Sequence, residues 1–244
     1  RVDEVSIGYN AYSILKTGAD EYGTKFPILL RAYDDWRPAL YVYLVIPFVA
    51  LFDLNVFAVR LPSVILSTLS IIAVYFLLRE LFANTKKFSV LGFEFSVAEI
   101  AALLLAISPW HIYISRLGHE VNASYAFFIF GLLFFFRFLN REKWNLHVSA
   151  IFFALSFSSY QSTKLVVPLV LLVLIFLHFK TLLENKKTVI VASIIGFLVA
   201  LPILATLFDQ NALIRFKGTS LLSTSEQYFD VQRQRLAFDR KSGD

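Results

Sequence analysis

Long apolar stretches, separated by short polar connections, dominate this 244-residue sequence. A membrane-spanning helix needs about 20 mostly apolar residues, and six stretches come close to that length with at most one Asp, Glu, Lys or Arg each. They are residues 61–78, 95–115, 121–136, 144–163, 165–179 and 188–208. Only 17% of the residues are charged, against roughly 25% in an ordinary soluble domain. The pattern therefore predicts an all-α, polytopic membrane helix bundle with six transmembrane helices.

A seventh apolar run, residues 38–52, is shorter than the others. It contains Pro47 together with Tyr41 and Tyr43, a composition suited to the membrane interface as well as to its core. If the run lies along the surface, Asp3 is on the same side as the start of the first span. If it crosses, residues 1–37 lie on the opposite side. Both placements are open, and we favour the surface.

Lys and Arg residues gather in three connections that alternate along the chain. They are Arg79, Lys86 and Lys87, then Arg137, Arg141 and Lys143, then Lys180, Lys186 and Lys187. Because Lys and Arg are enriched in cytoplasmic loops, we expect these connections to be cytoplasmic and the others to face outward, in an integral protein of the cell (plasma) membrane. The clusters do not line one face, so the net charge of +5 predicts no nucleic-acid partner.

The first 60 residues are predicted to form an external loop with interfacial helices. Residues 4–17 place Val5, Tyr9, Tyr12 and Leu15 (or Ile14) at helical spacing before Gly18, which indicates a short amphipathic helix with a glycine cap. The transmembrane bundle is expected at 61–208 and a truncated external loop at 209–244. The chain starts without Met and ends in a polar stretch, so we interpret it as an N-terminal fragment.

Two adjacent acids, Asp3 and Glu4, precede the amphipathic helix. They suit the positive end of the helix dipole, and helix-start acids are the simpler interpretation. The functional interpretation is that one carboxylate takes the proton from an attacking hydroxyl, with partial desolvation raising its pKa. The two acids are therefore the candidate catalytic residues.

Further polar residues gather on the expected outer face, where each set also has a structural interpretation as membrane anchor, turn or helix cap. The candidate substrate-binding residues are Asp35, Arg37, Arg60, Arg116, His119, Glu120, Tyr160, Gln161 and Lys164. The acceptor pattern for N-glycosylation at Asn122 sits where a span begins, so we discount it.

One reaction fits this collection: a hydroxyl attacks a sugar C1 whose leaving group is a lipid-linked phosphate. A glycosidase needs a second acid to protonate its leaving group, whereas this transfer needs one base and cations that stabilise the phosphate. Asp3 would be the base, and Arg116 or Lys164 a cation. No cofactor or metal site is expected from the spacing, although the outer acids could bind a divalent cation through oxygen.

Spaced motifs along the chain resemble those of a known family. They are Asp3-Glu4, Pro38-x-Leu40-Tyr41-x-Tyr43, the run from Phe57 to Ser63, Tyr75 with Arg79-Glu80-Leu81-Phe82, and Ser108-Pro109-Trp110-His111 with Ser115-Arg116. Together, from Asp3 to about Pro202, they resemble the dolichyl-phosphate-mannose protein mannosyltransferase superfamily, glycosyltransferase family 39 and its relatives. Many relatives have two prolines where this chain has Pro38-Ala39, and it lacks their C-terminal spans and soluble carbohydrate domain.

The resemblance implies a C-type glycosyltransferase fold, with a span before Arg1 and a first external loop that carries surface helices. It also implies that the acidic pair carries catalysis, with Asp3 the stronger candidate, and that Glu120 lies where relatives place another acid. The expected partners are membrane lipids, a polyprenyl-phosphate sugar donor and a hydroxyl acceptor on protein, lipid or cell-envelope glycan. The sequence does not discriminate between sugars or acceptors.

Two alternatives belong to other functional classes. A polytopic transporter usually places polar groups near the membrane midplane, and here only Glu99 lies well within a proposed span. A non-catalytic lipid-phosphate-binding subunit would keep the basic and aromatic surface and tolerate loss of Asp3.

Overall fold

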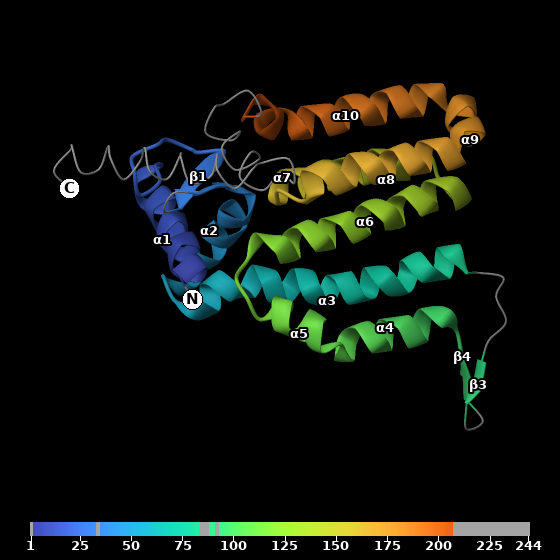
Figure 1. The fold of residues 1–244 in the computed structure, drawn as a ribbon, viewed down its shortest axis with the longest axis horizontal. Helices are drawn as coiled ribbons and strands as arrows, with labels where there is room; N and C mark the ends of the chain where they lie inside the picture. The colour runs from blue at the N-terminus through green and yellow to red at the C-terminus, as the bar shows by residue number, and fades with distance from the viewer. Residues whose placement is uncertain (1, 33–34, 83–87, 91–92, 207–244) are drawn as a thin grey trace, which may run out of the picture.

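The computed structural model describes residues 2–32, 35–82, 88–90 and 93–206, and most of these residues are helical (Figure 1). The helices are α1 (Val2–Thr17), α2 (Leu40–Phe52), α3 (Val56–Leu81), α4 (Val97–Ile107), α5 (Pro109–Ser115), α6 (Glu120–Asn140), α7 (Asn145–Ser159), α8 (Thr163–Leu177), α9 (Phe179–Glu184) and α10 (Lys186–Ala205). The expected external loop at 209–244 lies outside the described residues.

Two short antiparallel hairpins accompany the helices, so the structure is a helix bundle with two small sheets rather than purely helical. Strand β1 (Leu29–Ala32) pairs with β2 (Asp35–Pro38), and β3 (Phe88–Val90) pairs with β4 (Phe93–Phe95). The first hairpin precedes α2, and the second connects α3 to α4 at the opposite end of the bundle (Figure 1).

All six predicted spans contain a helix, but six membrane crossings are not confirmed. Among the described residues, α3, α6 and α10 are long and apolar enough to cross a membrane, and α4 with α5 would make a fourth as one bent span. Helices α7 and α8 have 15 residues each, a rise of about 22 Å against a hydrocarbon core of about 30 Å. The run at 144–163 overestimated the length of α7 because it included the turn at 160–162, whereas the run at 165–179 has the length of α8, two residues further along the chain.

The predicted span at 95–115 is broken in the middle. Helix α4 ends before Ser108, whose ψ of 122° is extended, as expected for a residue that precedes a proline. Pro109 then starts α5, which is bent by 59° from α4. At the other end of α4, Ser96 and Glu99 form a capping box, so Glu99 lies in the first turn of the helix rather than in mid-span.

Residues 2–60 lie at one end of the bundle (Figure 1). Helix α1 buries Ile7, Ala11 and Ile14 and packs against α2, whereas Val5 and Tyr9 lie on its exposed face. Helix α2 has 13 residues, a rise of about 20 Å, and it packs against α1 and α3 without following the length of the bundle. Whether this run lies along the membrane surface or crosses the membrane stays a prediction.

Candidate functional site

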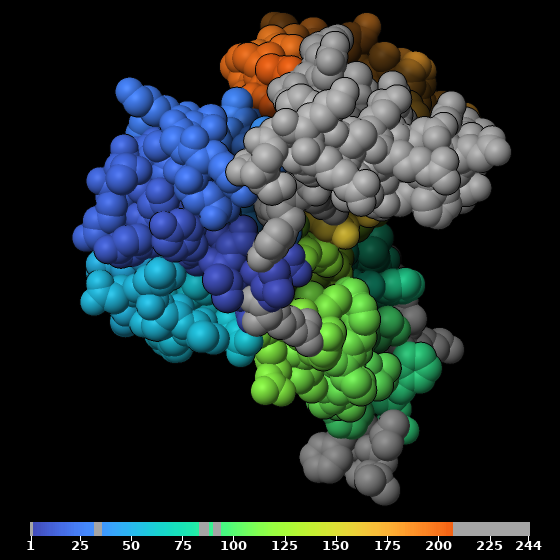
Figure 2. All heavy atoms as spheres, turned by 60° about the vertical axis from the view of Figure 1, so that its left-hand side comes forward, coloured from blue at the N-terminus to red at the C-terminus, as the bar shows by residue number. Residues whose placement is uncertain are grey.

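The candidate residues from distant parts of the sequence meet at the end of the bundle that carries α1. Figure 2 looks toward this end: the blue N-terminal residues and the cyan start of α3 form one continuous mass, with the light-green region around α5 beside them. Four segments contribute residues to this end of the bundle: the start of α1, the β1–β2 hairpin, the α5–α6 link and the α7–α8 turn. The end is therefore where a site can be assembled.

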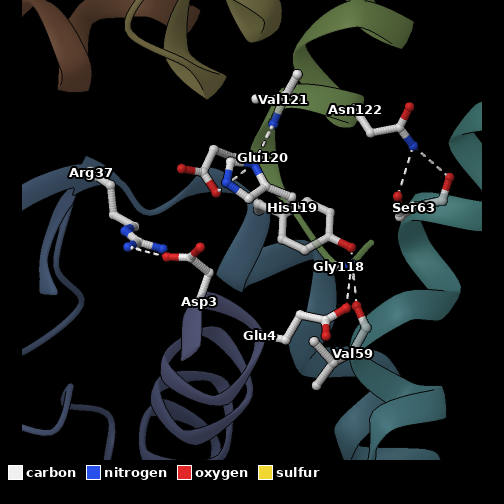
Figure 3. Close-up of polar contacts among 11 residues, drawn as sticks. Asp3, Glu4, Arg37, Val59, Ser63, Gly118, His119, Glu120, Val121 and Asn122 are labelled. Atoms are coloured by element: carbon white, nitrogen blue, oxygen red, sulfur yellow. Dashed lines mark hydrogen bonds and ion pairs between the residues drawn. The ribbon is translucent and has the colours of Figure 1, made fainter. Parts of the chain in front are cut away.

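Asp3 lies in the first turn of α1 and pairs with Arg37 on β2. Arg37 Nη2 donates to Asp3 Oδ1 over 2.8 Å (Figure 3), and the Asp3 side chain remains 49% exposed while that of Arg37 is nearly buried. The hydrogen bond from Arg37 lowers the pKa of Asp3, and burial only partly opposes it. Desolvation alone raises this pKa, as expected, but the net shift is downward because the guanidinium outweighs the loss of water.

The Glu4 side chain points in another direction and accepts more hydrogen bonds than Asp3 does. It accepts from Arg60 Nε and Nη2 at 2.7 and 2.8 Å and from the Gly118 backbone N–H at 3.0 Å (Figure 3). Its side chain is only 10% exposed. These partners, the Arg60 hydrogen bond first, lower its pKa to about 2. Glu4 thus ties α1 to α3 and to the α5–α6 link.

Gly118 is a site residue that the sequence interpretation missed. A Cβ at this position would lie 2.8 Å from Val59 Cγ1 and 2.9 Å from the Val59 carbonyl oxygen, which is too close for any side chain. The absence of a side chain lets the α5–α6 link reach α3, where its N–H meets Glu4. The only sequence signal was a glycine in a short link directly before His119 and Glu120.

His119 and Glu120 begin α6 and face the same region as Asp3 (Figure 3). His119 is the N-cap: its Nδ1 accepts from the Val121 backbone N–H over 3.2 Å. The same nitrogen lies 3.4 Å from Glu120 Oε2. Because a nitrogen that accepts carries no proton, we assign this second contact as a neighbour rather than a hydrogen bond. Glu120 is buried, with 3% exposed.

The α7–α8 turn also approaches this end. The Tyr160 ring lies 6.4 Å from the His119 ring, edge to face, and Gln161 Nε2 donates to the Trp36 carbonyl oxygen over 3.5 Å. Lys164 is half-buried in the first turn of α8. Tyr160 and Gln161 thus join the set formed by Asp3, Glu4, Arg37, Arg60, His119 and Glu120.

Two predicted residues are not brought into this set. Arg116 caps the C-terminus of α5 and is exposed, with no side-chain partner within the described part of the chain. Asp35 begins β2 and pairs with Ala32 through the backbone, but its side chain lies outside what the structure describes. Within the described ranges, no group of three or more His, Asp or Glu side chains could hold a metal ion.

A cluster of buried polar side chains connects α3 to the first turn of α6, next to the candidate site. Asn122 Nδ2 donates to the Ser63 carbonyl and hydroxyl oxygens at 2.7 and 2.8 Å (Figure 3), and Ser67 donates to Asn122 Oδ1 over 3.0 Å. Asn122 is 1% exposed, so its amide is inaccessible to glycosylation in the folded chain. The sequence interpretation discounted the acceptor pattern correctly but did not anticipate this tie between helices.

The long apolar helices define an integral helical membrane protein. Residues 36–205 match the family model described as dolichyl-phosphate-mannose-protein mannosyltransferase, and the chain belongs to this family. Membership makes it a membrane glycosyltransferase of the mannosyltransferase type. The matched segment includes Arg37, Arg60 and Glu120 but not Asp3 or Glu4. No curated protein and no solved structure matches the chain.

Proposed function

We propose that this chain transfers a sugar from a polyprenyl-phosphate donor to a hydroxyl acceptor, with Asp3 as the base. The acceptor oxygen forms a bond to the sugar C1 as its proton passes to the Asp3 carboxylate. The bond from C1 to the phosphate oxygen breaks, and the polyprenyl phosphate leaves with the electron pair. The observation that carries the proposal is the half-exposed carboxylate of Asp3 at the polar end of a membrane bundle.

The contrast between the two acids supports Asp3 over Glu4 as the base. Both oxygens of Glu4 accept from Arg60, and one also accepts from Gly118. Among the described residues, Asp3 accepts one side-chain hydrogen bond, from Arg37 to Oδ1, and half of its side chain is exposed. A lowered pKa keeps Asp3 ionised and able to accept a proton at neutral pH. Glu4 is better suited to hold α1 in place.

Arg37 is the cation best placed to stabilise the leaving phosphate. It lies beside the base, and its buried Nη1 has no hydrogen-bond partner among the described atoms. Guanidinium groups bind phosphate through paired N–H donors. Arg37 therefore suits this role better than the exposed Arg116, while Lys164 remains a second candidate. We place the reaction on the extracytoplasmic face, because the basic connections gather at the other end of the helices.

The position of the charged groups favours an enzyme over a transporter. Glu99, the acid expected within a span, caps the start of α4, and the acids of the candidate site lie at helix starts. A transport path usually needs such groups near the midplane.

The test is sugar transfer by the full-length protein in membranes, from a radiolabelled mannosyl polyprenyl phosphate, with Asp3→Asn compared to wild type at equal expression. We expect transfer to fall by at least about a hundredfold, as for loss of a general base, while donor binding survives. Asp53→Asn is the matched control: Asp53 is exposed in the α2–α3 link and has a φ of 60°, which Asn also adopts. Equal transfer by Asp3→Asn and wild type would refute the assignment of the base and leave a lipid-phosphate-binding subunit as the better account.

A further inference from the structure

An apolar groove lies between α8 and α10, with α7 packed against both. Its volume is about 360 Å³. Among the described residues that line it, Ser149 and Ser193 are the polar ones, and the Ser149 hydroxyl donates a hydrogen bond to the Gly131 carbonyl oxygen over 2.8 Å. Ile175 and Phe197 at the groove are about half exposed, at 46% and 57%. The groove therefore offers an occupant apolar contact and almost no hydrogen bonding.

Helices α8 and α10 both run along the length of the bundle, and the short α9 connects them at one end (Figure 1). The groove between α8 and α10 therefore follows the bundle axis. On α10 its lining extends from Val189 to Leu204, a rise of about 22 Å. This length is most of the roughly 30 Å hydrocarbon core of a bilayer. An extended hydrocarbon chain has the shape and the chemistry that such a groove accommodates.

Three exposed lysines lie at the end of the groove farthest from Asp3. Lys180 is on α9, next to the lining residue Leu182, and Lys186 and Lys187 begin α10 just before Val189. Within the described residues none of the three has an ion-pair partner. Cations are disfavoured at a helix N-terminus, so stabilisation of α10 does not explain Lys186 and Lys187. Membrane topology accounts for lysines on this side, but not for an apolar groove that ends at them.

We propose that this groove binds one acyl chain of an anionic phospholipid, with its phosphate at Lys180, Lys186 and Lys187. The lipid belongs to the leaflet opposite the one that faces the Asp3 end. The apolar lining selects a hydrocarbon chain, and the lysines select a negative headgroup. The sugar donor has its phosphate at Arg37, at the other end of the bundle, so the two lipids occupy different ends.

The experiment measures lipid binding to the full-length protein by native mass spectrometry, with phosphatidylglycerol, phosphatidylcholine and polyprenyl phosphate as the probes and no sugar donor present. Crosslinking from a cysteine placed at Ser193 tests whether another segment of the protein covers the groove. The first variant is the triple Lys180→Gln/Lys186→Gln/Lys187→Gln, and the second is Ser193→Phe, which fills the groove. A third variant, the single change Lys186→Gln, is compared with a charge-matched control, Arg79→Gln. The control removes one cation from α3 at the same end of the bundle but away from the groove. Protease accessibility checks that orientation in the membrane is unchanged.

We expect wild type to bind phosphatidylglycerol in preference to phosphatidylcholine, with the triple variant weakened at least about tenfold. We expect Ser193→Phe to lose phosphatidylglycerol, and Arg79→Gln to bind as wild type does. Unchanged binding by the triple variant, or equal effects of Arg79→Gln and Lys186→Gln, overturns the proposal. So does a groove that takes polyprenyl phosphate instead of phosphatidylglycerol, or that crosslinks to another segment of the protein.

Discussion

Adjacent acids at the start of α1 have different partners, and this difference is the basis of the different roles that we propose for them. Asp3 turns toward Arg37 and keeps half of its side chain exposed, whereas Glu4 is enclosed by Arg60 and Gly118. Neighbouring residues of a helix point about 100° apart because 3.6 residues make a turn, so one pair of acids reaches two sets of partners. The sequence indicates the acids and the arginines, but it does not pair them.

Replacing Arg37 should change the pH dependence of transfer. The Arg37 hydrogen bond lowers the pKa of Asp3 below 3.8, and a base works only when deprotonated, so wild type should lose activity through Asp3 only below that pH. In Arg37→Gln the charge of Arg37 no longer opposes the effect of burial, so the pKa of Asp3 should rise. The acid limb of the kcat/KM profile should therefore move to higher pH. The pH–rate profiles of both proteins test this. An unmoved limb would show that Asp3 titrates independently of Arg37 or is not the base.

The Glu4 ion pair should stabilise the fold in a defined pH range. Its folded pKa of about 2 lies below the ordinary value of 4.5, so the stabilisation is complete above pH 4.5 and is lost as the pH falls toward 2. Near pH 7, Glu4→Gln should lose about 2 kcal/mol, as for a charge-assisted hydrogen bond. Thermal unfolding from pH 7 to 3 should show the difference from wild type shrinking. The exposed Glu184→Gln should show neither effect.

The α5–α6 link positions the site at the scale of secondary structure elements. The break at Pro109 turns α5 away from the α4 axis, the link then approaches α3 through Gly118, and α6 begins with His119 as its cap. Asn122 fixes the first turn of α6 to α3. Together these features hold Glu120 near α1. The motifs predicted helix ends here, and packing brought those ends together.

Gly118→Ala should disturb this link. Its Cβ would lie 2.9 Å from the backbone oxygen of Val59, which cannot yield as a flexible side chain would, so α6 must shift away from α3 and the bond to Glu4 must lengthen. We expect a lower Tm and weaker transfer. Gly196→Ala in α10 is the control, because its Cβ would meet Ala150 at 3.4 Å and alanine favours a helix. A Gly118→Ala protein with wild-type Tm and activity would contradict the close approach.

The basic connections gather at the end of the bundle away from α1, whereas the end with α1 carries acids paired with arginines. Helix α6 starts at Glu120, at the end of the bundle that carries α1, and runs to the opposite end (Figure 1). There Arg141, which follows α6, pairs with Glu80 of α3 over 2.6 Å. Such a division orients a membrane protein, since basic ends stay in the cytoplasm. It also keeps the candidate site at one surface, where the lipid-linked donor and hydroxyl acceptor that we propose would both reach it.

The absence of Cys from the chain permits a direct test of this orientation. We expect Thr24→Cys and Ser162→Cys, both exposed at the Asp3 end, to react with an impermeant maleimide added outside intact cells. Lys143→Cys, exposed at the basic end, should react only after the membrane is opened. Labelling of Thr24→Cys and Ser162→Cys from opposite sides would mean that 38–52 crosses the membrane and that the described arrangement of α1 and α2 is wrong.

The sequence by itself determined the features that depend on neighbours along the chain. Apolar runs without charge specify helices, and Gly18, with a φ of 72°, ends α1, because these choices rest on local propensity and hydrogen bonding. It also located the candidate acids and the basic connections. The spaced motifs along the chain indicated the family, and the family model confirms it.

Only the tertiary structure decided which of these residues act together. Glu4 and Gly118 are 114 positions apart, and Asn122 and Ser63 are 59 apart. No local rule pairs them. Their contacts depend on how closely α1, α3 and α6 pack, which is set by side-chain volume and by a missing Cβ at Gly118. The pKa of Asp3 depends in turn on that packing, and for this reason its direction was the opposite of the one expected from the sequence.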